Sequence, residues 1–171
     1  MTNSIIITNK INKFNKNITV SGDKSLSIRW VLFSSLASGI SKASNLLISE
    51  DVAAAISAVK KLGIKVQLKN NFCKIHGKGI NGYNYRKGII IDAKNSGTLG
   101  RLILGLLINS PFPIKLIGDK SLSKRDFKRI SDPLTKFGAN FKLKNKKNLP
   151  LIIKGSSHLK SITYYENKGS A

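Results

Sequence analysis

The sequence predicts an α/β (mixed α+β) protein built from repeated βαβαββ units. Stretches with the two-residue alternation of strands are interleaved along the chain with stretches of helical periodicity. The segments KKLGIKV and TKFGANF, each a helix end followed by a strand, recur 75 residues apart, from Gly63 to Gly138. Arg29 and Arg101, each within the first helix of its unit, lie 72 residues apart. Such self-similarity is typical of units that bury their faces against each other.

The chain opens with short strands. They are expected at 5–8 and 18–20, on either side of a polar turn. Ser25 stands where a helix cap is expected, and the helix that follows ends at Gly39. Because this helix is largely apolar, we expect it to be buried on most sides. A loose alternation over 40–47 then predicts a strand.

The second helix of the first unit begins at Ser49. Two acidic residues follow Ser49, and they favour the positive end of the helix dipole. One helical face carries the apolar residues Val52, Ile56, Val59 and Leu62. Gly63 ends the helix. Alternation over 64–68 predicts a strand, and a turn at 70–71 leads into another strand around 73–75.

The second unit repeats this order. Strands are expected at 89–91, 114–117, 141–143 and 151–153, and helices at 98–108 and 125–137. Gly138 ends the last helix, but Pro133 lies inside it and should kink or restart it near Asp132. The string GDKSLS occurs at 22–27 and again at 118–123. This spacing does not match the repeat, so we interpret the second copy as a coincidence at another helix entrance.

The net charge is +22, from 30 Lys and Arg against 8 Asp and Glu. A polyanionic partner such as nucleic acid could explain this charge. However, only five of the cations are arginines, and the lysines are scattered through predicted turns. A nucleic-acid binder gathers arginine and aromatic residues on one surface. We therefore favour a compositional bias and expect no nucleic-acid partner, with a basic nucleic-acid-binding module as the alternative.

The chain also lacks membrane and metal signals. No apolar run reaches the ~20 residues of a membrane span, and the N-terminus does not read as a signal peptide. Cys73 is the single cysteine, so no internal disulfide can form. His76 and His158 have no neighbours at metal-ligand spacing. We expect a cytoplasmic protein without a membrane partner, a metal site or a cofactor.

Three segments could bind an anion. In SGDKSLSIR (21–29) a glycine-containing turn opens an apolar helix, whose first N–H groups lack internal partners and attract anions. Arg29 follows Ser25 by four residues and can face the same helix mouth. KNSGTLGR (94–101) has the same design, and SKRDFKR (123–129) carries two arginines four residues apart. Taken singly, each segment could instead be an ordinary capped or solvated helix start.

Together these segments resemble the EPSP synthase family of enolpyruvyl transferases. The resemblance is carried, in order, by SGDKSLSIR, ISEDV, NSGTLGR, GDKSLSKRDFKRISDPLTKFGA, LPLIIKG and the terminal ENKGSA. It covers the chain from Ser21 onward. The nearest alternative is the related family of UDP-N-acetylglucosamine enolpyruvyl transferases, because they share the repeat. They lack the first motif, so we favour EPSP synthase.

The resemblance implies the enolpyruvyl transferase fold, an inside-out α/β barrel with two lobes of three βαβαββ units each. The chain would then be an N-terminal fragment with an incomplete fold. Residues 1–20 would be opening strands of the other lobe, 21–86 the first unit, 87–160 the second, and 161–171 the start of a truncated third unit. The family's reaction moves the enolpyruvyl group of phosphoenolpyruvate to the 5-hydroxyl of shikimate 3-phosphate and releases phosphate.

The resemblance also implies roles for individual residues. Lys24 matches a lysine that contacts both anionic substrates. Ser25 and Arg29 match residues that hold shikimate 3-phosphate. Asn95 and Gly97 match a turn that lies against phosphoenolpyruvate.

Further matches follow along the chain. Arg125 matches an arginine on the phosphate of phosphoenolpyruvate. Ser170 and Ala171 match a segment that binds the shikimate phosphate. Arg101 also matches a family position, but we expect it to support the site without touching substrate.

No catalytic residue is expected within this chain, because the family's acid–base aspartate, glutamate and lysine lie in its C-terminal part. Enolpyruvyl transfer needs protons delivered and removed at defined atoms. We therefore expect the polypeptide to be inactive alone, to need the C-terminal lobe as its partner, and to belong to a monomeric full-length enzyme. An unfilled edge and apolar surface are expected where the third unit is missing.

Overall fold

The computed structural model describes residues 6, 8, 10, 13 and 15–165. The helices are α1 (Lys24–Leu36), α2 (Glu50–Lys61), α3 (Gly97–Leu106) and α4 (Lys128–Lys136), with a 3₁₀ turn η1 (Leu122–Lys124) before α4. The strands are β1 (Ile40–Ala43), β2 (Lys65–Lys69), β3 (Phe72–His76), β4 (Ile90–Asp92), β5 (Ile114–Ile117), β6 (Asn140–Lys144) and β7 (Asn148–Lys154). The chain is thus a mixed α/β structure, as predicted.

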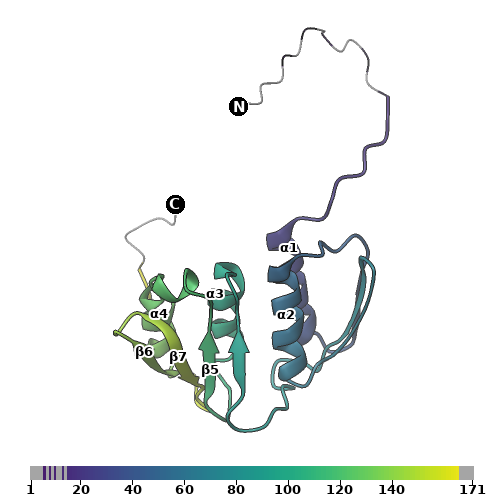
Figure 1. Ribbon diagram of the computed structural model, residues 1–171. Helices are drawn as coiled ribbons and strands as arrows, with labels where there is room; N and C mark the ends of the chain where they lie inside the picture. The colour runs from purple at the N-terminus through teal and green to yellow at the C-terminus, as the bar shows by residue number, and fades with distance from the viewer. Residues whose placement is uncertain (1–5, 7, 9, 11–12, 14, 166–171) are drawn as a thin grey trace.

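The strands form two sheets that follow the repeat. The first sheet has the order β1-β3-β2 and is antiparallel throughout. The second has the order β4-β5-β7-β6, in which β4 and β5 are parallel and the other pairs antiparallel. Figure 1 shows α1 and α2 beside the first sheet, and α3 and α4 beside the second. The second unit therefore has the complete predicted order βαβαββ.

Among the described residues, no strand precedes α1. Residues 18–20 form no strand, so this prediction is wrong. Ile18 and Val20 are 69% and 70% exposed, and the Val20 carbonyl accepts a hydrogen bond from the Asn45 side chain. In the second unit β4 pairs in parallel with β5, whereas here β1 remains at the sheet edge. Without sheet pairing, this segment gains no ladder of hydrogen bonds.

Two other predictions concern the chain ends. Residues 5 and 7 of the strand predicted at 5–8 lie outside the described residues, and residues 6 and 8 have no strand assignment. The start of a third unit is predicted at 161–171. Residues 161–165 contain no helix or strand, and 166–171 lie outside the described residues.

The starts of α1 and α4 differ from prediction. Asp23, not Ser25, caps α1, because its backbone is extended and its side chain accepts from the Leu26 amide. The last helix begins at Lys128, because 122–124 form a separate 3₁₀ turn. The helix continues through Pro133 instead of restarting, and the Phe137 amide donates to the Pro133 carbonyl.

A shared core lies between the helices and the sheets. Ile28 and Val31 of α1 are fully buried, but Leu26 and Phe33 are 67% and 59% exposed, so α1 is less buried than predicted. The predicted apolar face of α2, formed by Val52, Ile56, Val59 and Leu62, is buried as expected. Buried residues of α3 join the same cluster. This packing places α1, α2 and α3 together.

Candidate anion-binding site

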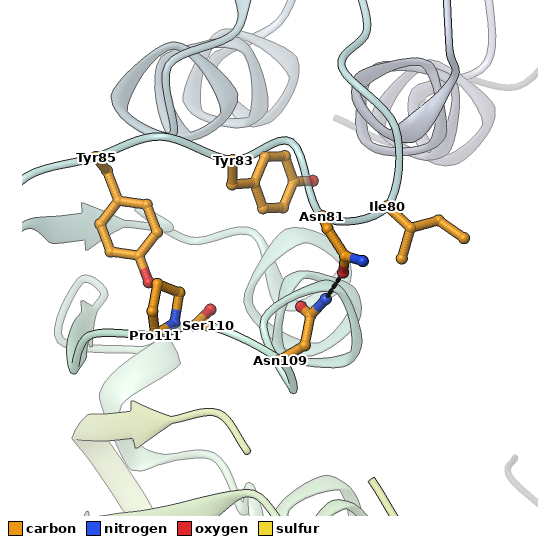
Figure 2. A pocket seen from close by; sticks show the side chains of 7 residues that line it. All are labelled: Ile80, Asn81, Tyr83, Tyr85, Asn109, Ser110 and Pro111. Atoms are coloured by element: carbon orange, nitrogen blue, oxygen red, sulfur yellow. Dashed lines mark hydrogen bonds between the residues drawn. The ribbon is translucent and has the colours of Figure 1, made fainter. Parts of the chain in front are cut away.

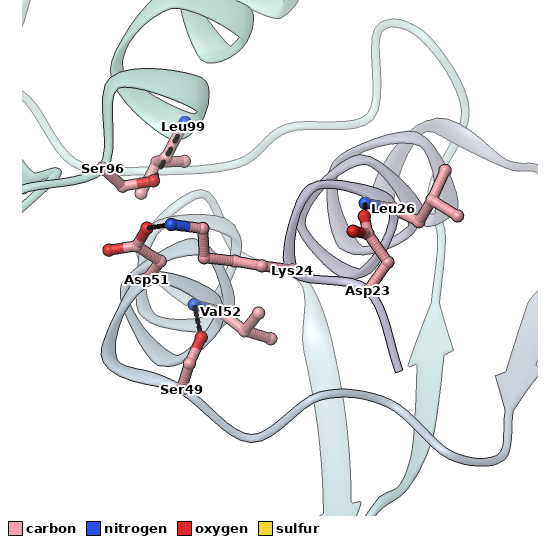
Figure 3. Close-up of polar contacts among 8 residues, drawn as sticks. All are labelled: Asp23, Lys24, Leu26, Ser49, Asp51, Val52, Ser96 and Leu99. Atoms are coloured by element: carbon pink, nitrogen blue, oxygen red, sulfur yellow. Dashed lines mark hydrogen bonds and ion pairs between the residues drawn. The ribbon is translucent and has the colours of Figure 1, made fainter. Parts of the chain in front are cut away.

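The site begins with three helix N-termini that meet at one end of the molecule (Figures 1 and 3). At each N-terminus a side-chain oxygen accepts a hydrogen bond from a backbone amide. Asp23 accepts from Leu26 at 2.7 Å, Ser49 from Val52 at 3.4 Å, and Ser96 from Leu99 at 3.3 Å. Each cap satisfies one backbone donor, and the remaining N–H groups and the helix dipoles leave positive potential at this end. The arrangement therefore favours anions.

A cavity of about 420 Å³ opens where these helix ends meet. It is lined by Lys24, Asp51, Asn95, Gly97, Thr98, Arg101 and Arg125. Three of these side chains are cations and one is a carboxylate. Lys24 Nζ lies 3.3 Å from Asp51 Oδ2, so this ion pair joins the first turns of α1 and α2 (Figure 3). The cavity retains an excess of positive charge.

A second cavity of about 310 Å³ shares a wall with the first. It is lined by Arg29, Gly97, Thr98, Arg101, Leu102, Arg129 and Ile130. Gly97, Thr98 and Arg101 line both cavities. Two anionic groups could thus be held on either side of one turn of α3.

Arg101 is the cation common to both cavities. Burial lowers its pKa, and the positive charges of Arg129 and Arg125 add to this effect, with Asp126 opposing it. Its Nε atom is buried without a hydrogen-bond partner in the described part of the chain. None of the ion pairs found among residues 15–165 involves an arginine. An unpaired cation in a partly buried position gains stability when an anion binds beside it.

Asp119 organises the turn that carries Asn95. Its carboxylate accepts from the Leu122 amide at 2.7 Å and from Asn95 Nδ2 at 2.6 Å. The pKa of Asp119 is lowered, chiefly by the Leu122 hydrogen bond and further by Asn95. The same carboxylate therefore fixes the entrance of α3 and the 3₁₀ turn that ends at Arg125.

Gly97 is in close contact with Arg125. A Cβ atom at Gly97 would lie 2.8 Å from Arg125 Nη1, closer than real Cβ atoms approach. Glycine is therefore required for Arg125 to reach across the start of α3 into the first cavity.

The predicted site residues separate into groups. Lys24, Asn95, Gly97 and Arg125 line the first cavity, and Arg29 lines the second. Ser25 lies in the first turn of α1 but lines neither cavity. The predicted residues Ser170 and Ala171 lie outside the described residues.

The sequence-based site prediction does not include three charged residues that line the cavities. Asp51 was read only as a helix-start residue, Arg101 as a supporting residue and Arg129 as a solvated cation, yet all three line a cavity. The signal for Arg101 was available, because it occupies the repeat position of Arg29. The ion pair of Asp51 depends on how two helices pack, which local sequence does not reveal.

Other site types find no support in the described part of the chain. No three His, Cys, Asp or Glu side chains there come together as metal ligands. None of its helices combines the length and apolar character needed to cross a membrane.

The fold and the site together define a repeat-built α/β protein with cation-lined cavities where its helix N-termini converge. A family model for EPSP synthase (3-phosphoshikimate 1-carboxyvinyltransferase) matches residues 8–171, and the chain belongs to this family. The resemblance seen in the sequence is thereby confirmed.

Individual relatives agree with this assignment. The chain is 38% identical over 167 residues to the 3-phosphoshikimate 1-carboxyvinyltransferase of Leuconostoc mesenteroides, covering 95% of this chain and 38% of the relative. It is 40% identical over 158 residues to the enzyme of the same name from Bacillus cytotoxicus, covering 92% of this chain and 37% of the relative. A solved EPSP synthase from Acinetobacter baumannii superposes with a TM-score of 0.83 at 36% identity, covering 90% of this chain and 35% of the solved one. The chain thus spans little more than a third of the length of its relatives.

Proposed function

We propose that this chain supplies part of the substrate site of an enzyme that transfers the enolpyruvyl group of phosphoenolpyruvate to the 5-hydroxyl of shikimate 3-phosphate. Family membership gives the reaction class, and the paired cationic cavities support the assignment of substrates. Both substrates carry a phosphate and a carboxylate, so a site for them needs several cations in a concave surface. The two adjoining cavities around Gly97 and Arg101 meet this need.

The residues take distinct roles in this proposal. Arg125 and Lys24 bind the anionic groups of phosphoenolpyruvate in the first cavity, and the turn at Asn95 and Gly97 lies against the same substrate. Arg29 in the second cavity binds shikimate 3-phosphate, aided by Ser25 when the substrate reaches the start of α1. Ser170 and Ala171 are proposed to contact its phosphate.

Arg101 and Arg129 extend the predicted set. Arg101 lies between the two cavities and would neutralise charge from both substrates, while Arg129 would bind on the side of Arg29. This arrangement brings two anions together, whose mutual repulsion would otherwise oppose binding.

The residues that line the two cavities are suited to binding the substrates and not to transferring protons. Asp51 is the one carboxylate among the described residues that line the two cavities, and it is paired with Lys24. A base held by a lysine is poorly suited to take a proton from the 5-hydroxyl. We infer that the polypeptide alone binds substrates weakly without turning them over, and that a C-terminal lobe completes a monomeric, cytoplasmic enzyme.

Calorimetric titration of the 171-residue chain tests the proposal. Phosphoenolpyruvate and shikimate 3-phosphate should each bind, and Arg125→Met should weaken phosphoenolpyruvate binding at least tenfold. Arg86→Met, at an exposed arginine outside both cavities, is the matched control and should leave binding unchanged. Equal binding by all three proteins would contradict the site assignment, and formation of product by the chain alone would contradict its inactivity.

A further inference from the structure

A third cavity, of about 240 Å³, lies at the other end of α1 and α3 from the anion site. It is lined by Ile80, Asn81, Tyr83, Tyr85, Asn109, Ser110 and Pro111 (Figure 2). Lys24 begins α1, whereas Ser35, which holds Tyr83, lies in its last turn, so about 17 Å of helix separates the two regions. The cavity therefore does not belong to the anion site.

The lining of this cavity carries no charged side chain. That is unusual in a chain with a net charge of +22, where the other polar cavities described above are lined by arginine and lysine. Burial raises the pKa of Tyr83, so its phenol stays neutral at physiological pH. An ionic ligand would leave water without meeting a counterion in the lining of this cavity, which is unfavourable. A neutral ligand avoids this cost.

The aromatic walls are held in place by hydrogen bonds. The Tyr83 hydroxyl is 2.7 Å from Ser35 Oγ, and the Tyr85 hydroxyl donates to the Phe112 carbonyl at 3.1 Å. The Tyr85 ring also packs edge-to-face on Phe112, with ring centroids 6.2 Å apart. Because the two rings are already positioned, a ligand that packs on them pays little entropy for ordering them.

Two polar atoms in the cavity wall remain available. Ser110 is 4% exposed, and its Oγ is buried without a hydrogen-bond partner among the described residues. Its backbone is fully engaged, since its amide donates to Leu107 and its carbonyl accepts from Gly155. Asn109 donates its amide nitrogen to Asn81 at 2.5 Å, which leaves the Asn109 amide oxygen as an acceptor. Figure 2 shows the Asn109 amide oxygen on the side that faces Ser110, and the Ser110 hydroxyl on the side that faces Asn109.

We propose that this cavity binds a small neutral ring compound that bears a carboxamide or lactam group. Its N–H would donate to the Asn109 amide oxygen, its carbonyl would accept from the Ser110 hydroxyl, and its ring would pack against Tyr83 and Tyr85. The cavity is smaller than the ~300–1,000 Å³ of sites for drug-sized ligands, so a single ring is the appropriate size. The ligand would relieve the buried, unpaired hydroxyl of Ser110.

The test is an NMR titration of the ¹⁵N-labelled 171-residue chain with benzamide as the probe. Benzamide should shift amide signals of 80–85 and 109–112, with a dissociation constant on the order of 1 mM. Benzoate has the same shape but a negative charge, and it should instead shift residues around Arg101. Absence of benzamide shifts at 80–85 and 109–112, or equal shifts there with benzoate, would overturn the proposal.

A pair of variants makes the test specific. Ser110→Ala removes the unpaired hydroxyl and keeps the shape, so it should leave the melting temperature unchanged or raised while weakening benzamide binding about fivefold. Ser57→Ala, at an exposed position on α2, is the control and should change neither. If Ser110→Ala binds benzamide as tightly as the unmodified chain, the proposed hydrogen bond is wrong. The benzamide shifts and the melting temperatures do not depend on substrate binding at the anion site.

Discussion

Lys24 and Asp51 connect the first turns of α1 and α2 through an ion pair of 3.3 Å within the anion-binding cavity. The Lys24 side chain is 54% exposed and that of Asp51 is 20% exposed, so solvent screens the pair and its contribution to stability is small. Its effect on binding is larger in principle, because the carboxylate competes with an incoming anion for the same lysine. We therefore expect Asp51 to weaken anion binding at this site.

Asp51→Asn should tighten anion binding. The variant removes one negative charge from the cavity and frees Lys24, so the affinity for inorganic phosphate should rise about threefold. The free energy of unfolding should fall by about 0.5–1 kcal/mol through loss of the ion pair and of the helix-dipole interaction. Calorimetric titration and urea unfolding measure the two effects.

Glu50→Gln is the matched control for this change. It removes a carboxylate from the same first turn of α2 that lines neither anion cavity, so phosphate affinity should stay nearly constant. A loss of affinity in Asp51→Asn would instead mean that the carboxylate holds Lys24 in its binding position.

Arg101→Met should separate stability from binding. Arg101 is repelled by Arg125 and Arg129 and has a buried, unpaired Nε, so methionine should keep the packing and leave the melting temperature equal or higher. Phosphate affinity should fall at least tenfold, because both cavities lose their common cation. The contact of Arg101 with the Phe127 ring, at 6.0 Å, is the interaction that this variant loses.

Arg86→Met again serves as the comparison. Arg86 is exposed and outside both cavities. Its replacement lowers the net charge by one but should change neither the melting temperature nor the phosphate affinity. A marked drop in melting temperature for Arg101→Met alone would show that Arg101 is primarily structural.

Gly97→Ala should displace Arg125 without disturbing the fold. The added Cβ would lie 2.8 Å from Arg125 Nη1, the far end of a flexible side chain that can move away. Anion affinity in the first cavity should therefore fall several-fold, while unfolding in urea stays within about 1 kcal/mol of the unmodified chain.

Gly105→Ala tests the same substitution in the same helix. A Cβ at Gly105 meets nothing within 4 Å, so this variant should be neutral for binding and neutral or mildly stabilising for the fold. If both variants bind phosphate equally well, Arg125 does not depend on the space at Gly97.

Local sequence was sufficient for much of this fold. The end of α2 at Gly63, with its φ of 85°, and the turn at Asn70, with its φ of 51°, follow from residues that tolerate positive φ. In both GDKSLS strings the aspartate accepts a hydrogen bond from the amide three residues on, at 2.7 Å, but only Asp23 is the N-cap of an α-helix. The second string leads into the 3₁₀ turn η1, whose cap residue Ser121 makes no side-chain cap hydrogen bond.

The wrong strand prediction at 18–20 and the incomplete set of cavity residues both originate in long-range structure. Residues 18–20 have strand-like sequence, but a strand also needs a partner, and pairing is decided by chain far away. The placement of Arg29 and Arg125 in adjoining cavities depends on how α1 packs beside α3. Sequence identified both arginines, but the shared wall formed by Arg101 emerged only from that packing.

The hydrogen bonds of Asp119 predict a loss of stability in acid. Its carboxylate is stabilised in the folded state by the Leu122 amide and by Asn95, so its folded pKa lies below the unfolded value of 3.8. A depressed pKa contributes stability that is present above the unfolded pKa and is lost as the pH falls through the folded pKa, because the unfolded state then binds more protons.

Asp119→Asn removes this dependence while keeping an oxygen that can accept from Leu122. The unmodified chain should be more stable than the variant at pH 7 and pH 5, and the difference should shrink as the pH falls below 3.8. Urea unfolding at a series of pH values measures this difference directly. A gap between the two proteins that stays constant down to pH 2 would mean that Asp119 acts through shape alone and that its charge does not organise the Asn95 turn.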